Sequence, residues 1–200
     1  MKIQDILLFD EQLTDEELII QKSARDYCQN ELLPRITNAN RNEIFDKGIY
    51  KEMGELGFLG APIDGYGCAG TNYVSYGLIA REIERVDSSY RSAFSVQTSL
   101  AMHAIYHFGS DEQKDFYLPQ MAKGELIGCF GLTESDAGSD PASMKTNAVE
   151  KDDGYILNGS KTWITNSPIA DVFIIWALNE KLETNSIKGF ILEKGLEGLS

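Results

Sequence analysis

Apolar side chains in the first part of the chain recur every three or four residues, which is the period of an amphipathic helix. Thr14 followed three residues later by Glu17 matches a capping box, the reciprocal pairing that opens many helices. The apolar pattern continues to Pro34, which has no amide hydrogen and is expected to end or bend the helix. A second, shorter helix is expected within residues 45–60, and the Gly and Pro residues of 61–72 predict a loop.

Two further helical stretches and another helix start follow this loop. Apolar positions between Tyr76 and Val86 share one face of a third helix. Residues 90–109 are apolar or small around most of the helix circumference, which is typical of a helix buried inside a bundle. Ser110 with Gln113 forms a second capping box and predicts one more helix after it.

The spacing of apolar residues shortens after Gly124, and turn signals appear at Asp153–Gly154 and Asn158–Gly159. Asn158–Gly159 is a strong signal for a hairpin between two strands. Helices followed by antiparallel strands predict an α+β protein, with a helical domain at 1–124 and a β domain at 125–200. The expected strands lie in the runs Leu126–Thr133, Tyr155–Thr165, Val172–Leu178 and Lys188–Gly195.

The composition limits the partners that the protein can have. Asp and Glu outnumber Lys and Arg by 31 to 18, and the formal net charge is -13. Nucleic acid and anionic membranes both need a surplus of cations, so neither is expected as a partner. The longest apolar runs are far shorter than the roughly 20 residues of a membrane span. Three widely spaced cysteines, Cys28, Cys68 and Cys129, indicate neither a disulfide framework nor a metal site.

The N-terminal residues resemble neither a secretory signal nor a mitochondrial presequence. They are acidic from Asp5 onward, whereas a secretory signal has a basic start and a long apolar stretch. A mitochondrial presequence is rich in Arg and poor in Asp and Glu, whereas these residues contain many Asp and Glu and no Arg. We therefore expect a cytoplasmic protein, or a mitochondrial matrix protein whose presequence has been removed.

The segment from Cys129 to Asp140 combines the residue types of a ligand-binding loop. Gly131 and Gly138 allow a close approach of the backbone, and Thr133 supplies a hydroxyl between them. Free amides and small side chains at the end of a strand can hold a polyphosphate or a planar polar ring. Taken alone, the segment is more typical of an ordinary turn than of a binding site.

Two linked motifs resemble the acyl-CoA dehydrogenase family. The first is Thr-Glu followed by Gly-Ser-Asp, and the second, about two dozen residues later, is Asn-Gly followed by Lys and Trp-Ile-Thr. The resemblance spans the whole chain, which corresponds to about half of a family-length protein. The matching residues are Thr133, Glu134, Gly138, Ser139, Asp140, Asn158, Gly159, Lys161, Trp163, Ile164 and Thr165.

This resemblance implies a fold and a cofactor. An all-α N-terminal domain would precede an incomplete, β-barrel-like middle domain, and the family's C-terminal four-helix domain would be absent from this chain. FAD is the implied cofactor, with Thr133 next to the isoalloxazine ring and Trp163–Thr165 on a strand that walls it. Without the partner motif, Trp163 would be interpreted as a core aromatic. The implied FAD-binding residues are Phe130, Gly131, Leu132, Thr133, Gly138, Ser139, Trp163, Ile164 and Thr165.

Arg91 stands at the start of the apolar stretch 90–109. Ser92 flanks it, and Ser95 shares its helix face one turn later. Glu84 would point the same way if the helix were continuous. Because most of its neighbours are small or apolar, the Arg91 guanidinium is expected near buried surface, where it needs an anionic partner. The alternative is a surface arginine paired with Glu84 or Asp87.

The same stretch resembles the glutaryl-CoA dehydrogenase branch of the family. There the arginine and the two serines hold the distal carboxylate of glutaryl-CoA, the glutamate that matches Glu84 lies close by, and Ser139 resembles a residue near the CoA side. The resemblance implies oxidative decarboxylation of glutaryl-CoA to crotonyl-CoA and CO2, electron transfer flavoprotein as the acceptor, and a homotetramer. A dehydrogenase for another short-chain acyl-CoA and a truncated, inactive flavoprotein remain as alternatives.

The family's catalytic base, a glutamate, is implied to lie outside this stretch. No residue within 1–200 matches its motif, so no catalytic residue is expected here. We expect residues 1–200 by themselves to lack dehydrogenase activity. An unfinished sheet would also leave open strand edges, which favour aggregation.

Overall fold

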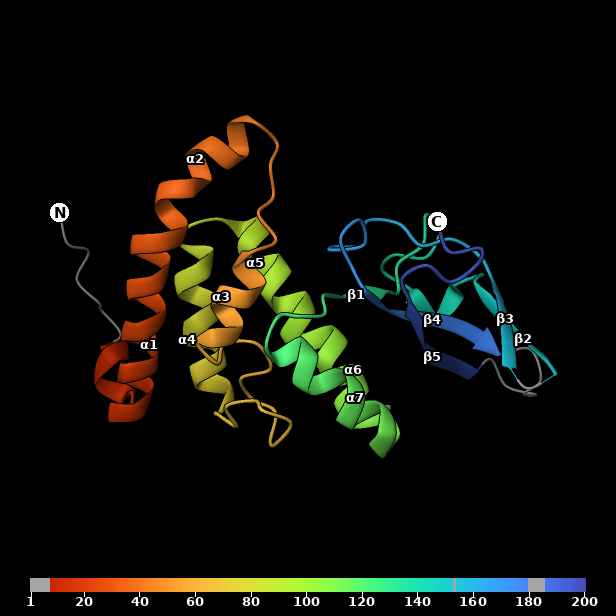
Figure 1. Ribbon diagram of the computed structural model, residues 1–200, viewed down its shortest axis with the longest axis horizontal. Helices are drawn as coiled ribbons and strands as arrows, with labels where there is room; N and C mark the ends of the chain where they lie inside the picture. The colour runs from red at the N-terminus through yellow and green to blue at the C-terminus, as the bar shows by residue number, and fades with distance from the viewer. Residues whose placement is uncertain (1–7, 153, 180–185) are drawn as a thin grey trace.

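The computed structural model describes residues 8–152, 154–179 and 186–200, and it shows a helical body beside a β-sheet (Figure 1). The helical class followed by strands is as expected from the sequence. The helical elements are η1 Phe9–Gln12, α1 Asp15–Tyr27, η2 Cys28–Leu32, α2 Leu33–Arg41, α3 Ile49–Glu55, α4 Tyr73–Glu84, α5 Ser88–Ser95, η3 Val96–Met102, α6 His103–Phe108, α7 Asp111–Ala122 and η4 Pro141–Ser143. The strands are β1 Gly128–Gly131, β2 Asn147–Lys151, β3 Gly154–Asn158, β4 Val172–Asn179 and β5 Ser186–Glu193.

Both predicted capping boxes are confirmed. The Thr14 hydroxyl accepts from the Glu17 amide before α1, and the Glu17 carboxylate accepts from the Thr14 amide. Ser110 and Gln113 make the same pair of bonds before α7. These bonds satisfy amides that have no partner within the first turn of a helix, so both starts are fixed locally by the sequence.

Pro34 was expected either to end or to bend the first helix, and it does not end it. The chain passes from α1 through the π-helical segment η2 directly into α2, where Pro34 occupies the first turn. The Leu33 amide donates to the Cys28 carbonyl five residues back, so the turn before the proline is widened. A widened turn accommodates the proline, whose ring would otherwise clash with the carbonyl four residues earlier.

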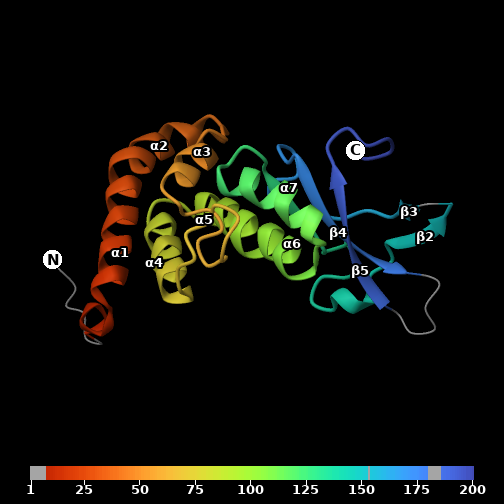
Figure 2. The same ribbon diagram turned by 60° about the horizontal axis from the view of Figure 1, so that its bottom comes forward.

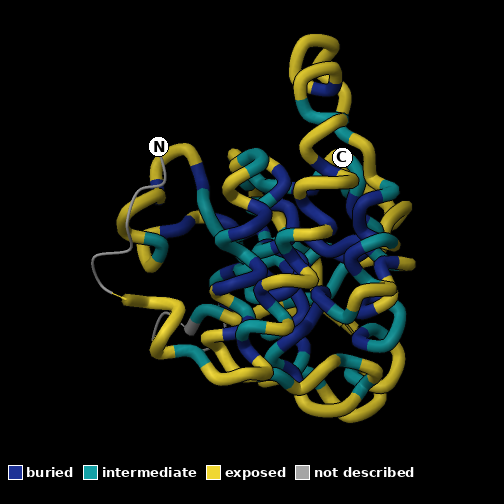
Figure 3. The backbone as a smooth tube through the Cα atoms, turned by 90° about the vertical axis from the view of Figure 1, so that its left-hand side faces the viewer, coloured by how far each residue is buried: buried dark blue, intermediate teal, exposed yellow. Residues whose placement is uncertain are grey.

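The long apolar helix is present as three continuous pieces, α5, η3 and α6, and it forms the middle of the helical body (Figure 2). Its buried residues contribute to two cores. One lies among the helices and includes Phe94, while the other lies between helices and sheet and joins Met102 and Ile105 to Ile174. Figure 3 shows that buried backbone gathers in the interior and that exposed backbone lies around it.

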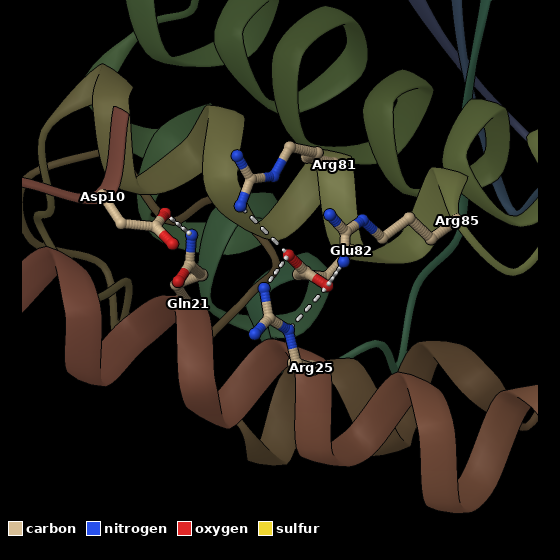
Figure 4. Close-up of polar contacts among 6 residues, drawn as sticks. All are labelled: Asp10, Gln21, Arg25, Arg81, Glu82 and Arg85. Carbon is tan, nitrogen blue, oxygen red and sulfur yellow. Dashed lines mark hydrogen bonds and ion pairs between the residues drawn. The ribbon is translucent and has the colours of Figure 1, made fainter. Parts of the chain in front are cut away.

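Helices α1 and α4 are joined through Glu82, whose side chain is fully buried (Figure 4). Arg25 from α1 binds both carboxylate oxygens at 3.2 and 3.3 Å. Arg81 and Arg85 approach the same carboxylate from α4 and its C-cap at 3.4 and 3.5 Å. Three guanidiniums therefore compensate one buried charge, which would be costly if it were unpaired.

Gln97, in the middle of the long helix, ties the helical body to the sheet. Its side chain is completely buried. The amide nitrogen donates to the carbonyls of Met121 at 3.1 Å and Leu126 at 2.8 Å, and the amide oxygen accepts from the Gly128 N–H at 2.7 Å. The first residue of β1 is thus held against the helix by a buried amide that has partners at both ends.

The sheet is mixed, so the expectation of an antiparallel domain is only partly right. β4 pairs antiparallel with β5 along its whole length, but it pairs in parallel with β1 over one part and with β2 over another. β2 and β3 pair antiparallel, with Lys151 opposite Gly154. Long connections between β1, β2 and β4 make parallel pairing possible, and alternation of residue types does not reveal strand direction.

The hairpin predicted at Asn158–Gly159 is wrong. β3 ends at Asn158, and residues 159–171 carry no strand. At Gly159, which has φ of 152°, a Cβ atom would lie 2.7 Å from the Thr146 Cα. The glycine therefore serves a close approach of two backbones where the chain leaves the sheet.

Candidate flavin and acyl-thioester site

The loop after β1 is anchored by an ion pair between Glu134 and Lys161. Their Oε1 and Nζ atoms are 2.8 Å apart, and both side chains are less than a tenth exposed. The Lys161 ammonium also donates to the Leu132 carbonyl at 3.0 Å, and Glu134 accepts from the amides of Lys145 and Thr146. One pair of charges therefore connects three separate stretches of chain around the end of β1.

The pKa of Glu134 reports how strongly its charged form is held. Burial by itself raises the pKa of this carboxyl group, but the hydrogen bonds from Lys161 and from the Thr146 and Lys145 amides outweigh burial and lower the pKa to about 2. The carboxylate is therefore charged throughout the neutral range. Sequence reasoning placed Glu134 and Lys161 within the motifs and took Glu134 as a hydrogen-bond acceptor of the loop, but it did not predict that the two residues pair.

Trp163 does not lie on a strand, which corrects the expectation for the Trp-Ile-Thr segment. It has a positive φ of 58°, its side chain is 92% exposed, and its ring contacts no aromatic ring of the described residues. β-branched and aromatic residues raise strand propensity, but here the backbone bonds to the neighbouring loop instead. The Thr162 amide donates to the Thr133 carbonyl at 2.9 Å, and the Asn166 side chain donates to the Gly128 carbonyl at 3.0 Å.

The helical body reaches this segment through Ser92. Its Oγ lies 3.3 Å from the Thr165 Oγ1, and either hydroxyl can donate. The structure therefore brings together two groups of residues that were predicted separately. Thr133 lies beside the 161–166 segment, and Ser92 connects that segment to the start of α5.

Arg91, next to Ser92, forms an ion pair with Glu84. This pairing was expected under the interpretation of Arg91 as a surface arginine. Its Nε donates to Glu84 Oε2 at 2.7 Å, and the Ser88 hydroxyl donates to Glu84 Oε1 at 2.6 Å. These two bonds lower the pKa of Glu84, with the Ser88 bond the larger cause. The Arg91 side chain is 40% exposed, so the expectation of a guanidinium at buried surface is only partly met. Helices α4 and α5 are separate, and the pairing arises across the bend between them.

The two terminal nitrogens of Arg91 donate to no group within the described part of the chain. Because Glu84 takes only Nε, the planar end of the guanidinium is free to bind a carboxylate with two parallel bonds. Ser95, one helical turn further, accepts a hydrogen bond from the Tyr76 hydroxyl on α4 at 3.2 Å. Sequence reasoning missed Tyr76, which it assigned only to the apolar face of a helix.

Other predicted residues lie apart or serve packing. Ser139 and Gly138 are exposed on the loop, and within the described part of the chain no hydrogen bond or ion pair joins either residue to Arg91 or to Ser95. Gly131 is buried where a Cβ would lie 2.5 Å from Ile175 Cδ1, so its small size serves the packing of β1 on β4. Phe130, also on β1, packs against Trp176 with ring centroids 5.7 Å apart.

An apolar cavity of about 660 Å³ lies between α6 and the strands β3, β4 and β5. Phe108, Tyr155, Trp176 and Phe190 are among its lining residues, and none of the predicted site residues lines it. No group of three or more metal-ligating side chains occurs among the described residues. The described helices also include none with the length and apolar character needed to cross a bilayer.

Comparison with known proteins agrees with these features. Residues 14–125 match the acyl-CoA dehydrogenase N-terminal domain and residues 129–200 match the acyl-CoA dehydrogenase middle domain. The chain belongs to the acyl-CoA dehydrogenase family. Members of this family are oxidoreductases, and both linked motifs of this chain lie within the matched middle domain.

Two solved structures and one curated relative show the degree of similarity. A glutaryl-CoA dehydrogenase from Mycobacterium smegmatis, in complex with FADH2, is 44% identical with a TM-score of 0.91, covering 94% of this chain and 48% of that chain. The butyryl-CoA dehydrogenase of Megasphaera elsdenii is 36% identical with a TM-score of 0.86, covering 94% and 50%. A short-chain-specific acyl-CoA dehydrogenase of Clostridium acetobutylicum is 38% identical over 190 residues, 94% of this chain and 50% of the relative. The chain spans about half the length of the curated relatives it matches.

The residues around the end of β1 fit the flat, polar ring of a flavin. An indole that is 92% exposed on a backbone of positive φ has surface available for a planar ligand. The Thr133 hydroxyl has no hydrogen-bond partner among the described residues, and the Thr165 hydroxyl has only Ser92. Hydroxyl donors that remain available in this way can stabilise the negative charge of a reduced flavin.

Proposed function

We propose that the whole protein is an FAD-dependent acyl-CoA dehydrogenase whose substrate is a short dicarboxylic acyl-CoA, best matched by glutaryl-CoA. The product would be crotonyl-CoA, with loss of CO2. The observation that carries this proposal is the contact between Ser92 and Thr165, because it joins the helix that carries Arg91 to the segment expected to wall the flavin.

The roles of the residues follow from their contacts. FAD, when bound, would accept the β-hydrogen of the acyl chain as hydride. Phe130–Thr133, Gly138, Ser139 and the Trp163–Thr165 segment would surround the cofactor, with Ser139 also near the CoA side. Arg91, with Nε held by Glu84, would bind the distal carboxylate through its terminal nitrogens. Ser92 and Ser95 would complete the carboxylate site, and the base would lie outside residues 1–200.

The remaining parts of the proposal come from the family resemblance. Electron transfer flavoprotein would accept the electrons, and the complete enzyme would be a homotetramer in the cytoplasm or, after removal of a presequence, in the mitochondrial matrix. Residues 1–200 alone would be inactive. Reduction of a dye acceptor by purified residues 1–200 with glutaryl-CoA would contradict this last point.

Replacing Arg91 tests the substrate. In the FAD-loaded protein made from the complete reading frame, Arg91→Ala should lower kcat/KM for glutaryl-CoA by about ten- to a hundredfold, the worth of a hydrogen bond to a charged group. Butyryl-CoA, which has no distal carboxylate, should be little affected. Arg91→Lys, which keeps the charge but loses the planar fork, should fall between the two. Equal losses for both substrates would contradict a dicarboxylic substrate.

A dehydrogenase for a monocarboxylic short-chain acyl-CoA is the second candidate. It is favoured by the exposure of Arg91 and by its existing ion pair with Glu84, which together need no ligand. Wild-type protein that oxidises butyryl-CoA faster than glutaryl-CoA, and forms no CO2 from the latter, would establish this candidate. A reading frame that stops after Ser200 would instead favour an inactive flavoprotein remnant.

A further inference from the structure

Ser95 is held by a residue outside the set that the sequence motifs indicate. The Tyr76 hydroxyl, on α4, lies 3.2 Å from the Ser95 Oγ on α5 and donates to it. A phenolic O–H is more acidic than an aliphatic hydroxyl, which makes Tyr76 the donor in this pair. The Tyr76 ring is itself fixed, because it stacks on Phe94 with centroids 5.4 Å apart and an interplanar angle of 24°.

This contact decides what the Ser95 hydroxyl can do next. A serine hydroxyl has one hydrogen to donate and lone pairs that accept. When Tyr76 donates to the oxygen, the Ser95 hydrogen remains available, and it donates to no group within the described ranges. A hydroxyl in this state suits a ligand atom that only accepts, as a carboxylate oxygen does.

Without Tyr76, the same hydroxyl would be ambiguous. A serine within a helix commonly turns its hydrogen toward a backbone carbonyl of the preceding turn, which leaves a lone pair facing outward. An outward lone pair would repel a carboxylate and would not affect a methyl group. The orientation of this single hydrogen therefore bears on the choice between an acyl chain that ends in a carboxylate and one that does not.

The two polar neighbours of the proposed carboxylate site are oriented in the same manner. Glu84 occupies the Arg91 Nε and leaves the terminal nitrogens free, and Ser88 fixes Glu84 in turn. Tyr76 occupies the Ser95 oxygen and leaves the hydrogen free. In both cases, a residue of α4 engages the side of the group that would not face the ligand.

We propose that Tyr76 is a positioning residue for substrate specificity, which orients the Ser95 hydroxyl as a donor to the distal carboxylate of a dicarboxylic acyl-CoA. This inference rests on the proposed function. It adds a residue that contacts neither the cofactor nor the substrate and that acts only through Ser95.

The test compares two unreactive ligands on the FAD-loaded protein made from the complete reading frame. In 3-thiaglutaryl-CoA and 3-thiabutyryl-CoA a sulfur replaces the carbon that would lose hydride, so equilibrium binding can be measured by titration calorimetry without turnover. Tyr76→Phe keeps the ring and its stacking and removes only the hydroxyl. It should weaken binding of the dicarboxylic ligand by roughly two- to tenfold, as expected for one neutral hydrogen bond, and leave the monocarboxylic ligand unchanged.

Tyr90→Phe is the matched control. It removes a tyrosine hydroxyl one residue before Arg91, and that hydroxyl is buried without a hydrogen-bond partner among the described residues. The Tyr90→Phe protein should keep the wild-type ratio of the two affinities. In a Ser95→Ala background, Tyr76→Phe should have no further effect on this ratio, because the residue through which it acts is gone.

The possible outcomes distinguish a failure of the Tyr76 inference from a failure of the proposed dicarboxylic substrate. If wild-type protein binds both ligands equally well, the dicarboxylic substrate is wrong and the inference falls with it. If wild type prefers the dicarboxylic ligand and Ser95→Ala reduces that preference but Tyr76→Phe does not, only the inference is overturned. Equal weakening of both ligands by Tyr76→Phe, or loss of the folded protein, would show a structural role and overturn it as well.

Discussion

Ser92 Oγ and Thr165 Oγ1 lie 3.3 Å apart although the two residues are 73 positions apart in the chain. Ser92 belongs to the helical body and Thr165 to the irregular segment that follows β3. The contact is a direct polar link between α5 and that segment, and both side chains are only half-buried. The distance between the helix that carries Arg91 and the proposed flavin wall is therefore fixed in part by two hydroxyl groups.

This pair should show a measurable coupling. Ser92→Ala and Thr165→Val should each lower the free energy of unfolding by about 0.5–1.5 kcal/mol, the net worth of one hydrogen bond. The double variant should lose less than the sum of the single losses, because both changes remove the same contact. Urea unfolding of the four proteins measures the coupling. Strict additivity would mean that the two hydroxyls do not interact in solution.

Protonation of Glu134 should destabilise the protein in acid. Burial raises the pKa of this carboxyl group, but the hydrogen bonds from Lys161, Thr146 and Lys145 lower it from the ordinary value of 4.5 to about 2. A carboxyl group whose folded-state pKa is lowered contributes stability above its unfolded pKa, and this contribution is lost as pH falls from about 4.5 to about 2. A shift of this size corresponds to about 3 kcal/mol.

Glu134→Gln provides the comparison for this acid effect. The variant should be less stable at neutral pH, because Lys161 would be buried without a charge to compensate it. It should also lose less stability than wild type between pH 5 and about pH 2, since the titrating group is absent. Denaturant unfolding at several pH values gives both quantities. Parallel pH profiles for the two proteins would contradict the assignment.

Glu82 should matter more for folding than any exposed ion pair. Glu82→Gln removes the charge that three arginines share, and we expect a loss of about 2–3 kcal/mol, at the low end for a broken buried pair because those arginines can reach water. Asp26→Asn, which makes the same chemical change in the exposed Lys22–Asp26 pair, should cost less than about 1 kcal/mol. Similar melting temperatures for the two variants would disprove the difference.

The sequence predicted those parts of the fold that depend on local chemistry. Capping boxes at Thr14 and Ser110 use contacts three residues apart, so they can be read directly from the chain. The effect of Pro34 depended on a widened turn before it, which no local rule specifies. The hairpin signal at Asn158–Gly159 failed because Gly159 is required by its approach to Thr146, a contact between distant residues.

The sequence identified most residues of the candidate site but not the contacts between them. Thr133 and Trp163–Thr165 were recognised from linked motifs, whereas the Glu134–Lys161 pair that anchors their loops was not given a role. Arg91 was singled out by its apolar neighbours, and its partner Glu84 was among the expected ones. Tyr76 could not be identified, because its contact with Ser95 depends on the packing of α4 against α5.

The exposure of Trp163 gives the protein an optical reporter. The chain contains two tryptophans, and the other, Trp176, is partly enclosed by Phe108 and Phe130. The two indoles should therefore emit at different wavelengths, with the water-exposed Trp163 to the red. A ligand that covers the loop at the end of β1 should quench or blue-shift that red component and leave the emission of Trp176 unaltered.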